Sequence, residues 1–243
     1  MKLRIGVITD LHYAHEADPL HCDLKGERSL LLLAEVLRQN RVTGKEPDVY
    51  LLLGDTLQEP DCPDAGKLLM EIRETFEATD VPMRFVAGNH DPSYPEMERV
   101  FGKQEPYFEA GNRRIVLFND TQIAEGCGAF REEREFELMR QAAVGFHGRL
   151  IAAQHVPLNP TARVCRSKYA YRNADEIAGE MKKLGYLLSI SGHDHCGETA
   201  YQWQGITFVT APALALPPFC WLNVEIDDND RIQIETGMLG DDF

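Results

Sequence analysis

Five short apolar runs in the sequence are each followed at once by polar residues of the kinds that bind metal ions. The polar clusters are Asp10-Leu11-His12, Gly54-Asp55, Gly88-Asn89-His90-Asp91, Gln154-His155 and Gly192-His193-Asp194-His195. Five of the eight histidines of the chain fall in these clusters, which a random scatter would rarely produce. Carboxylates, imidazoles and an amide oxygen suit first-row transition metals better than calcium or magnesium alone.

The number of candidate ligands favours two ions over one. The candidates are Asp10, His12, Asp55, Asn89, His155, His193 and His195. Seven ligands exceed the needs of one tetrahedral zinc site. They fit two ions that share a bridging carboxylate and keep open positions for water and substrate.

The elements that position these clusters follow from the spacing of apolar residues. Strands are expected at Leu3–Thr9, Val49–Leu53, Met83–Ala87, Arg114–Phe118, Arg149–Ala153 and Tyr186–Ile190, with helices at Glu27–Gln39, Asp64–Ala78, Arg131–Ala143 and Ala174–Leu184. The tail predicts strands at Thr199–Trp203, Thr207–Ala211, Cys220–Ile226 and Ile232–Thr236, joined by turns. This pattern predicts one α/β domain over residues 1–243 that ends in antiparallel hairpins. Because the carboxyl ends of strands gather at one edge of an α/β sheet, the five clusters are expected to meet there.

The composition and net charge of the chain limit the classes of molecule that it can bind. The chain has 243 residues, of which 44% are hydrophobic, and a formal charge of −14. This charge argues against nucleic-acid partners and anionic membranes, whereas an anionic substrate remains possible because bound metal ions reverse the local field. The apolar runs fall short of the about 18 residues of a membrane helix, and the first run is too short for a signal peptide. We therefore expect a cytoplasmic protein with reduced cysteines.

The order of the motifs resembles the signature of a known group of enzymes. The series DxH, GD, GNHD, H and GHxH, from residue 10 to 195, is similar to that of the calcineurin-like metallophosphoesterase superfamily. The chain length and the GNHD form look more like its branch of small phosphodiesterases. The resemblance implies an α/β fold in which two mixed β-sheets pack as a sandwich flanked by helices, in four layers.

The resemblance also implies ligand roles and a reaction. It assigns Asp10, His12 and His195 to a first metal and Asn89, His155 and His193 to a second, with Asp55 bridging the two. The ions would be divalent or trivalent transition metals, namely Mn, Fe, Zn or Ni. A hydroxide between them would attack the phosphorus of a small phosphodiester or phosphomonoester, with the diester preferred. His90 would face the substrate as general acid or charge stabiliser, and Asp91 would orient it.

Other readings of the sequence stay open. The segment 163–172 is basic in an acidic chain, so Arg163 and Arg166 are candidates for substrate binding, as is His15. A solvated loop is the alternative for each of them. At the level of function, the alternatives are a nuclease or protein phosphatase of the same superfamily, and a metal-binding scaffold without turnover. The oligomeric state is left open by the sequence.

Overall fold

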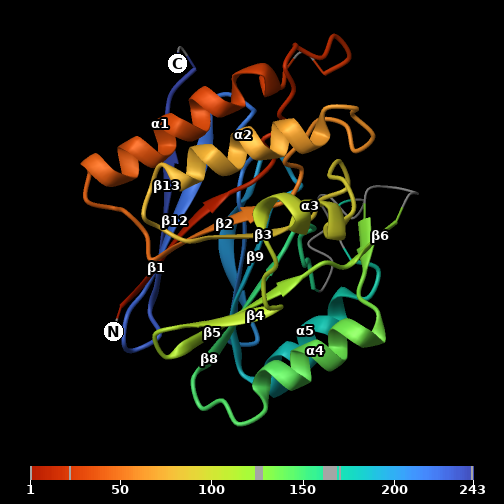
Figure 1. The fold of residues 1–243 in the computed structure, drawn as a ribbon. Helices are drawn as coiled ribbons and strands as arrows, with labels where there is room; N and C mark the ends of the chain where they lie inside the picture. Colours follow the sequence, from red (N-terminus) through yellow and green to blue (C-terminus); the bar gives the residue numbers. More distant parts are fainter. Residues whose placement is uncertain (1, 22, 124–127, 161–168, 170, 242) are drawn as a thin grey trace.

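The structure is a computed structural model that describes residues 2–21, 23–123, 128–160, 169, 171–241 and 243. Its centre is formed by two large mixed β-sheets, which lie between helices (Figure 1). The first sheet has five strands in the order β13-β12-β1-β2-β3, and the second has six in the order β10-β11-β9-β8-β5-β4. A separate pair, β6 and β7, forms a small hairpin.

The strands of the first sheet combine parallel and antiparallel pairs. They are β1 (Leu3–Ile8), β2 (Val49–Leu53), β3 (Met83–Val86), β12 (Cys220–Ile226) and β13 (Ile232–Met238). β1, β2 and β3 run parallel, whereas β12 pairs antiparallel with both β1 and β13. Every residue of β2 is buried, as expected for a central strand that is covered on both faces.

The second sheet has the same mixed character. Its strands are β4 (Tyr107–Ala110), β5 (Arg113–Phe118), β8 (Arg149–Gln154), β9 (Tyr186–Ser191), β10 (Glu198–Trp203) and β11 (Ile206–Thr210). β5, β8, β9 and β11 run parallel, and the edge strands β4 and β10 are antiparallel to their neighbours. The hairpin strands are β6 (Thr121–Ile123) and β7 (Gly128–Phe130).

The fold has four layers, namely helices, the first sheet, the second sheet and helices. A hydrophobic cluster lies between each pair of neighbouring layers. One cluster joins the facing sides of the two sheets, for example through Val7, Leu51 and Ile151. The helices are α1 (Ser29–Val42), α2 (Ala65–Glu77), α3 (Tyr94–Phe101), α4 (Glu133–Ala143) and α5 (Ala174–Leu184), and a 3-10 turn, Gly26–Arg28, precedes α1. A second cluster packs α1 and α2 on the first sheet, and a third packs α4 and α5 on the second. The expected sandwich of two mixed sheets flanked by helices is therefore confirmed.

The expected elements are present, with shifted ends and some omissions. The first helix begins at Ser29 rather than Glu27, and the charged helix begins at Glu133 rather than Arg131. The sequence analysis missed α3, β4 and the β6–β7 hairpin. Among the described residues, every helix is too short or too polar to cross a lipid bilayer.

Candidate metal centre

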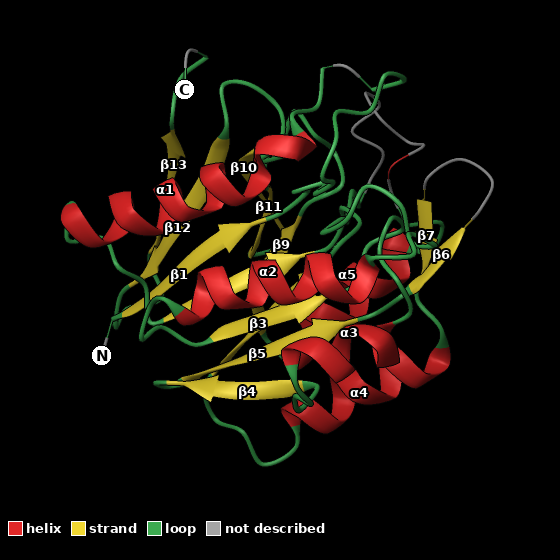
Figure 2. Ribbon diagram, turned by 45° about the horizontal axis from the view of Figure 1, so that its top comes forward, coloured by secondary structure: helices red, strands yellow, loops and turns green. Residues whose placement is uncertain are grey.

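The loops that follow five parallel strands meet at one end of the sandwich. Figure 2 shows β1, β3 and β5 pointing toward the side where the β6–β7 hairpin lies. The backbone N–H of Asp10 donates to the carbonyl of Gly54 at 3.0 Å, which joins the loops after β1 and β2. The two sheets are linked here as well, because the N–H of His193 donates to Oδ2 of Asp10 at 2.9 Å.

The first group of candidate ligands contains Asp10, His12, Asp55 and His195, whose ligand atoms all lie within 4.8 Å of one another. Nε2 of His12 is 3.1 Å from Nε2 of His195. Oδ1 of Asp10 is 3.5 Å from Nε2 of His195. The group is buried except for His195, whose side chain is 34% exposed. The structure thus brings together the three residues expected at the first metal and the expected bridging carboxylate.

The second group shares Asp55 with the first. It contains Asp55, His155 and His193. Nε2 of His155 lies 3.3 Å from Oδ1 of Asp55 and 3.0 Å from Nδ1 of His193. The amide oxygen of Asn89 is 3.2 Å from the same Nε2 atom. All seven expected ligands therefore lie in two adjoining groups, and Asp55 belongs to both.

The donor atoms of this site fit a bound cation. Nδ1 of His155 is 2.6 Å from the carbonyl of Leu53, which can only accept, so Nδ1 carries the proton. In the neutral ring, Nε2 then presents a lone pair toward the oxygens of Asp55 and Asn89. Oδ1 of Asp10 is buried and has no hydrogen-bond partner among the residues that the structure describes. Several acceptors that face one another in a buried place are the arrangement that a metal ion stabilises.

The electrostatics of the site are set by its burial and by its two carboxylates. Burial lowers the pKa of His12 to about 3, so its ring is neutral and able to bind a metal. Burial also raises the pKa of Asp10, and the neighbouring Asp55 adds to this shift. At His155, burial acts to lower the pKa, but Asp55, Asp10 and the Leu53 carbonyl together raise it to about 9, so this ring must lose a proton to bind a metal. Two buried carboxylates repel each other, and a cation between them removes that repulsion.

The backbone is unusual at the candidate ligands. Asp10, His12, Asp55 and His193 all have positive φ angles, between 44° and 67°. Residues with a Cβ atom adopt this left-handed region at a cost, and such strain gathers at functional sites. Gly54 precedes Asp55 with φ of 86°, and a Cβ atom there would lie 2.6 Å from Nδ1 of His155. Glycine at this position lets the β2 loop approach the histidine closely.

Comparison with known proteins assigns the chain to a family. The sequence model described as calcineurin-like phosphoesterase matches residues 3–197. The chain belongs to the calcineurin-like phosphoesterase family. Members of this family are metal-dependent phosphohydrolases that bind two divalent ions, and the two groups described above supply candidate ligands for both. No curated protein matches the sequence.

Solved structures of this family share the fold at low sequence identity. A dimetal phosphatase from Danio rerio has 16% identity and a TM-score of 0.77, over 98% of this chain and 96% of that one. A putative 5′-nucleotidase from Staphylococcus aureus has 14% identity and a TM-score of 0.61, over 100% and 55%. A purple acid phosphatase from yellow lupin seeds has 14% identity and a TM-score of 0.64, over 99% and 52%. This chain thus spans about half the length of the last two proteins.

His90 lies beside the first ligand group, and the Asp91 carboxylate bonds to backbone N–H groups. The ring centroids of His90 and His12 are 4.9 Å apart. Nδ1 of His90 donates to the backbone carbonyl of Gln58 at 2.7 Å. The carboxylate of Asp91 instead accepts from the N–H groups of Thr56 and Gly88, both at 2.8 Å. The expected role of Asp91 in orienting His90 therefore stays a prediction.

The Asp91 carboxylate connects two loops of the site. Its hydrogen bonds tie the loop after β3 to the loop after β2, next to Asp55. Burial and the charge of Asp55 raise the pKa of Asp91 to about 6. The sequence carried no sign that Gln58 would hold His90, because Gln58 uses a backbone atom that every residue type possesses.

Of the three expected substrate-binding residues, one lies at the surface beside α2 and two lie outside the described part of the chain. His15 is exposed, and its Nε2 atom is 3.3 Å from Oε2 of Glu71 on α2. Arg163 and Arg166 lie outside the described residues, so their role stays a prediction. Tyr169 belongs to the same basic segment of the sequence, and its ring centroid is 5.3 Å from that of His193.

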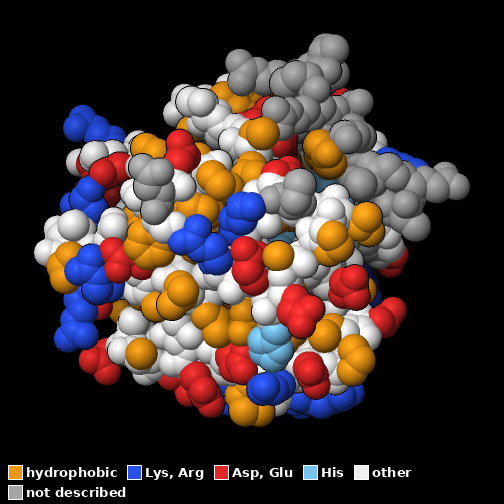
Figure 3. All heavy atoms as spheres, turned by 90° about the horizontal axis from the view of Figure 1, so that it is seen from above, with side chains coloured by type: hydrophobic (Ala, Val, Ile, Leu, Met, Phe, Trp, Pro, Cys, Tyr) orange, Lys and Arg blue, Asp and Glu red, His pale blue; other side chains and the backbone are white. Residues whose placement is uncertain are grey.

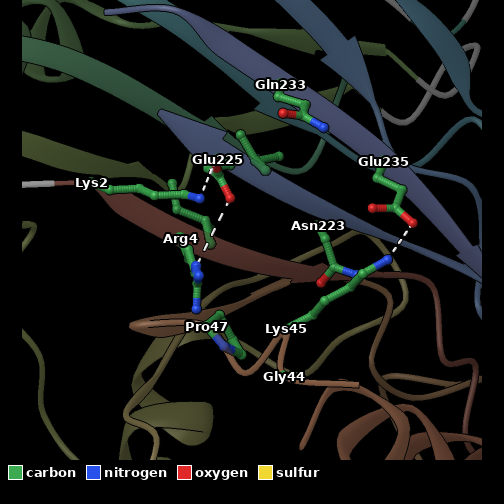
Figure 4. Close-up of a pocket in the computed structure, with 11 residues that line it drawn as sticks. Lys2, Arg4, Gly44, Lys45, Pro47, Asn223, Glu225, Gln233 and Glu235 are labelled. Carbon is green, nitrogen blue, oxygen red and sulfur yellow. Dashed lines mark hydrogen bonds and ion pairs between the residues drawn. The ribbon is translucent and has the colours of Figure 1, made fainter. Parts of the chain in front are cut away.

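A polar pocket lies at the amino-terminal end of β1, whereas the candidate metal centre lies beyond its carboxyl end. It has a volume of about 330 Å³ and is lined by Lys2 and Arg4 at the start of β1 (Figure 4). Lys2 and Arg4 form ion pairs with Glu225, and Lys45 with Glu235. The lining cations are thus already neutralised by glutamates, and the candidate ligands lie at the opposite end of the strand.

Proposed function

We propose that the chain is a dinuclear metal-dependent phosphoesterase that hydrolyses a small phosphodiester. The observation that carries the proposal is the pair of ligand groups that share Asp55, with His90 beside them. Asp10, His12 and His195 would hold one ion, and Asn89, His155 and His193 the other. When bound, the ions would activate water and neutralise negative charge on the phosphoryl oxygens. Mn, Fe, Zn and Ni are the candidate metals.

The side chains of the protein would complete the reaction. Because Nδ1 of His90 donates to Gln58, Nε2 is the nitrogen that can exchange a proton with the substrate. A protonated His90 would donate this proton to the leaving oxygen. Asp91 would keep the loop of His90 attached to the loop of Asp55. Asp55 would set the spacing of the two ligand groups, since its carboxylate belongs to both.

The preference for a diester rests on the chain length and the GNHD motif, which resemble the small phosphodiesterase branch. A phosphomonoester is the second candidate substrate, and the similar structures named as phosphatases and a nucleotidase favour it. A nuclease is disfavoured by the net charge of −14. In the view of Figure 3, acidic side chains are interspersed with basic ones over the described residues of that face.

Two measurements test the proposed function. Metal analysis of the purified chain should find close to two transition-metal ions. With added Mn, bis(p-nitrophenyl) phosphate should be hydrolysed with a higher kcat/KM than p-nitrophenyl phosphate. The Asp55→Asn variant should lose metal and turnover together. A chain that holds two ions and hydrolyses neither ester would contradict the phosphoesterase proposal, and a preference for the monoester would overturn the diester part alone.

The cytoplasmic location and the absence of nucleic-acid and membrane partners stay predictions from the sequence.

A further inference from the structure

Tyr169 lies in the connection between β8 and α5, and its ring contacts the second ligand group. The rings of Tyr169 and His193 have centroids 5.3 Å apart and planes at 83°, which is an edge-to-face contact. The Tyr169 side chain is half-buried. An aromatic ring with part of its surface open to solvent therefore stands at the edge of the proposed metal centre.

A buried ion pair fixes the chain two residues after Tyr169. The hydroxyl of Tyr171 donates to Oδ2 of Asp120 at 2.7 Å. The same carboxylate accepts hydrogen bonds from Nε and Nη2 of Arg131, at 2.8 and 2.7 Å. The Arg131 side chain is fully buried and its guanidinium lies 3.7 Å from the centroid of the Phe118 ring. Because a buried charge is costly to leave without its partners, this cluster holds Tyr171 in one place.

Other described residues of the connection also contact neighbouring strands. Tyr171 forms a parallel bridge with Ala129 of β7, and the N–H of Arg172 donates to the carbonyl of Ala129 at 2.9 Å. Before Tyr169, the carbonyl of Leu158 accepts from the hydroxyl of Tyr201 on β10 at 3.2 Å. The described residues Leu158 and Tyr171 of this connection are thus tied to β10 and β7.

The chemistry of Tyr169 differs from that of the ligand groups. Carboxylates, imidazoles and an amide serve the metals and the phosphoryl oxygens, whereas a phenol ring recognises another flat ring by stacking. Aromatic side chains stack on all nucleobases, since every base has a π face. We propose that Tyr169 determines specificity by stacking on a planar aromatic group, aryl or nucleobase, of the phosphoester at the metal centre. This inference rests on the proposed phosphoesterase function.

Three phosphonates test the inference without turnover. Phenylphosphonate, cyclohexylphosphonate and methylphosphonate resemble phosphate esters but contain a carbon–phosphorus bond in place of the ester bond. Their binding to the Mn-loaded chain is measured by calorimetry. The phenyl compound should bind about tenfold more tightly than the other two. The cyclohexyl compound separates aromatic stacking from simple burial of six carbon atoms.

Variants assign the preference to one side chain. Tyr169→Leu should abolish the phenyl preference and leave the affinity for methylphosphonate unchanged. Tyr169→Phe should keep the preference, because the ring remains. Tyr107→Leu serves as the matched control, since Tyr107 is a half-buried tyrosine on the edge strand β4. This control should behave as the wild type does.

Other results would overturn the inference. Tyr169 does not contact the planar group if the Tyr169→Leu variant keeps the phenyl preference. The same holds if the variant binds all three phosphonates more weakly by an equal factor. If the wild type binds methylphosphonate without preferring the phenyl compound, the inference is wrong while the proposed function stands. If no phosphonate binds and no ester is hydrolysed, the proposed function fails and the inference with it.

Discussion

The imidazole of His90 donates its Nδ1 proton to the backbone carbonyl of Gln58, 2.7 Å away. A carbonyl oxygen can only accept, so this contact selects one tautomer of the neutral ring and fixes its orientation. It leaves Nε2 as the nitrogen that is free to exchange a proton. Position and tautomer of the proposed general acid are therefore set by the loop after β2, a different loop from its own.

Removal of this imidazole should separate turnover from metal binding. In the His90→Ala variant we expect kcat to fall by about 10² to 10⁴, the usual contribution of a positioned acid or base. Metal content should stay unchanged because none of the seven candidate ligands is altered. His147→Ala, at an exposed histidine, is the control. Full activity of the His90→Ala variant would show that His90 has no part in the reaction.

Chelation should lower the thermal stability of the chain. The candidate ligands come from loops of both sheets, so bound ions join the two halves of the sandwich. A ligand at 100 times its Kd stabilises a fold by about 2.7 kcal/mol. Tm is measured with Mn, after treatment with a chelator, and after Mn is restored. The Asp55→Asn variant should show no response to Mn, and an equal Tm shift in that variant would contradict the assigned site.

Gly54→Ala should damage the metal centre, and Gly66→Ala should not. At Gly54 a Cβ atom would lie 2.6 Å from Nδ1 of His155, and the φ of 86° is costly for alanine, by about 1–2 kcal/mol. At Gly66, on α2, a Cβ atom meets nothing within 4 Å, so alanine should stabilise the helix by about 0.5–1 kcal/mol. Urea unfolding and metal analysis of the two variants provide the check. Normal metal content in Gly54→Ala would refute the close approach.

Arg131→Met should destabilise the fold strongly. Among the described residues, the substitution leaves the buried Asp120 carboxylate with the hydroxyl of Tyr171 as its side-chain partner. Breaking a buried ion pair costs about 3–5 kcal/mol. The free energy of unfolding in urea measures this cost. The double variant Asp120→Leu with Arg131→Met removes both charges and should recover much of the loss. A double variant as unstable as the single one would show that the cost comes from lost packing instead.

The sequence was sufficient to predict the strands and the convergence of the candidate ligands. Val49–Leu53 and Ala174–Leu184 have the bounds that apolar spacing predicted, because buried faces impose that spacing. The ligands were found because each follows a strand that ends at the same edge. The arrangement of the strands in two sheets, by contrast, was predicted from the resemblance to the calcineurin-like superfamily. Apolar periodicity shows that a strand is buried but not which strand lies beside it.

The elements that were missed show where local patterns fail. The start of α3 was marked by Ser93 and Glu96, which form a capping box, with Pro95 beside them. This local pattern is typical of a helix start. Arg131 is a different case, because the sequence suggested the start of a charged helix whereas the structure buries it against Asp120. Its partner is eleven positions away and no helical spacing relates the two, so only the folded chain reveals the pair.

Four of the candidate ligands, Asp10, His12, Asp55 and His193, hold the left-handed backbone that glycine adopts without cost. Glycine at any of these places would relax the chain and at the same time delete a metal-binding group. In the metal-free chain, glycine at these four sites should therefore stabilise the fold while it removes the metal centre, so stability without metal and metal binding oppose each other at these positions.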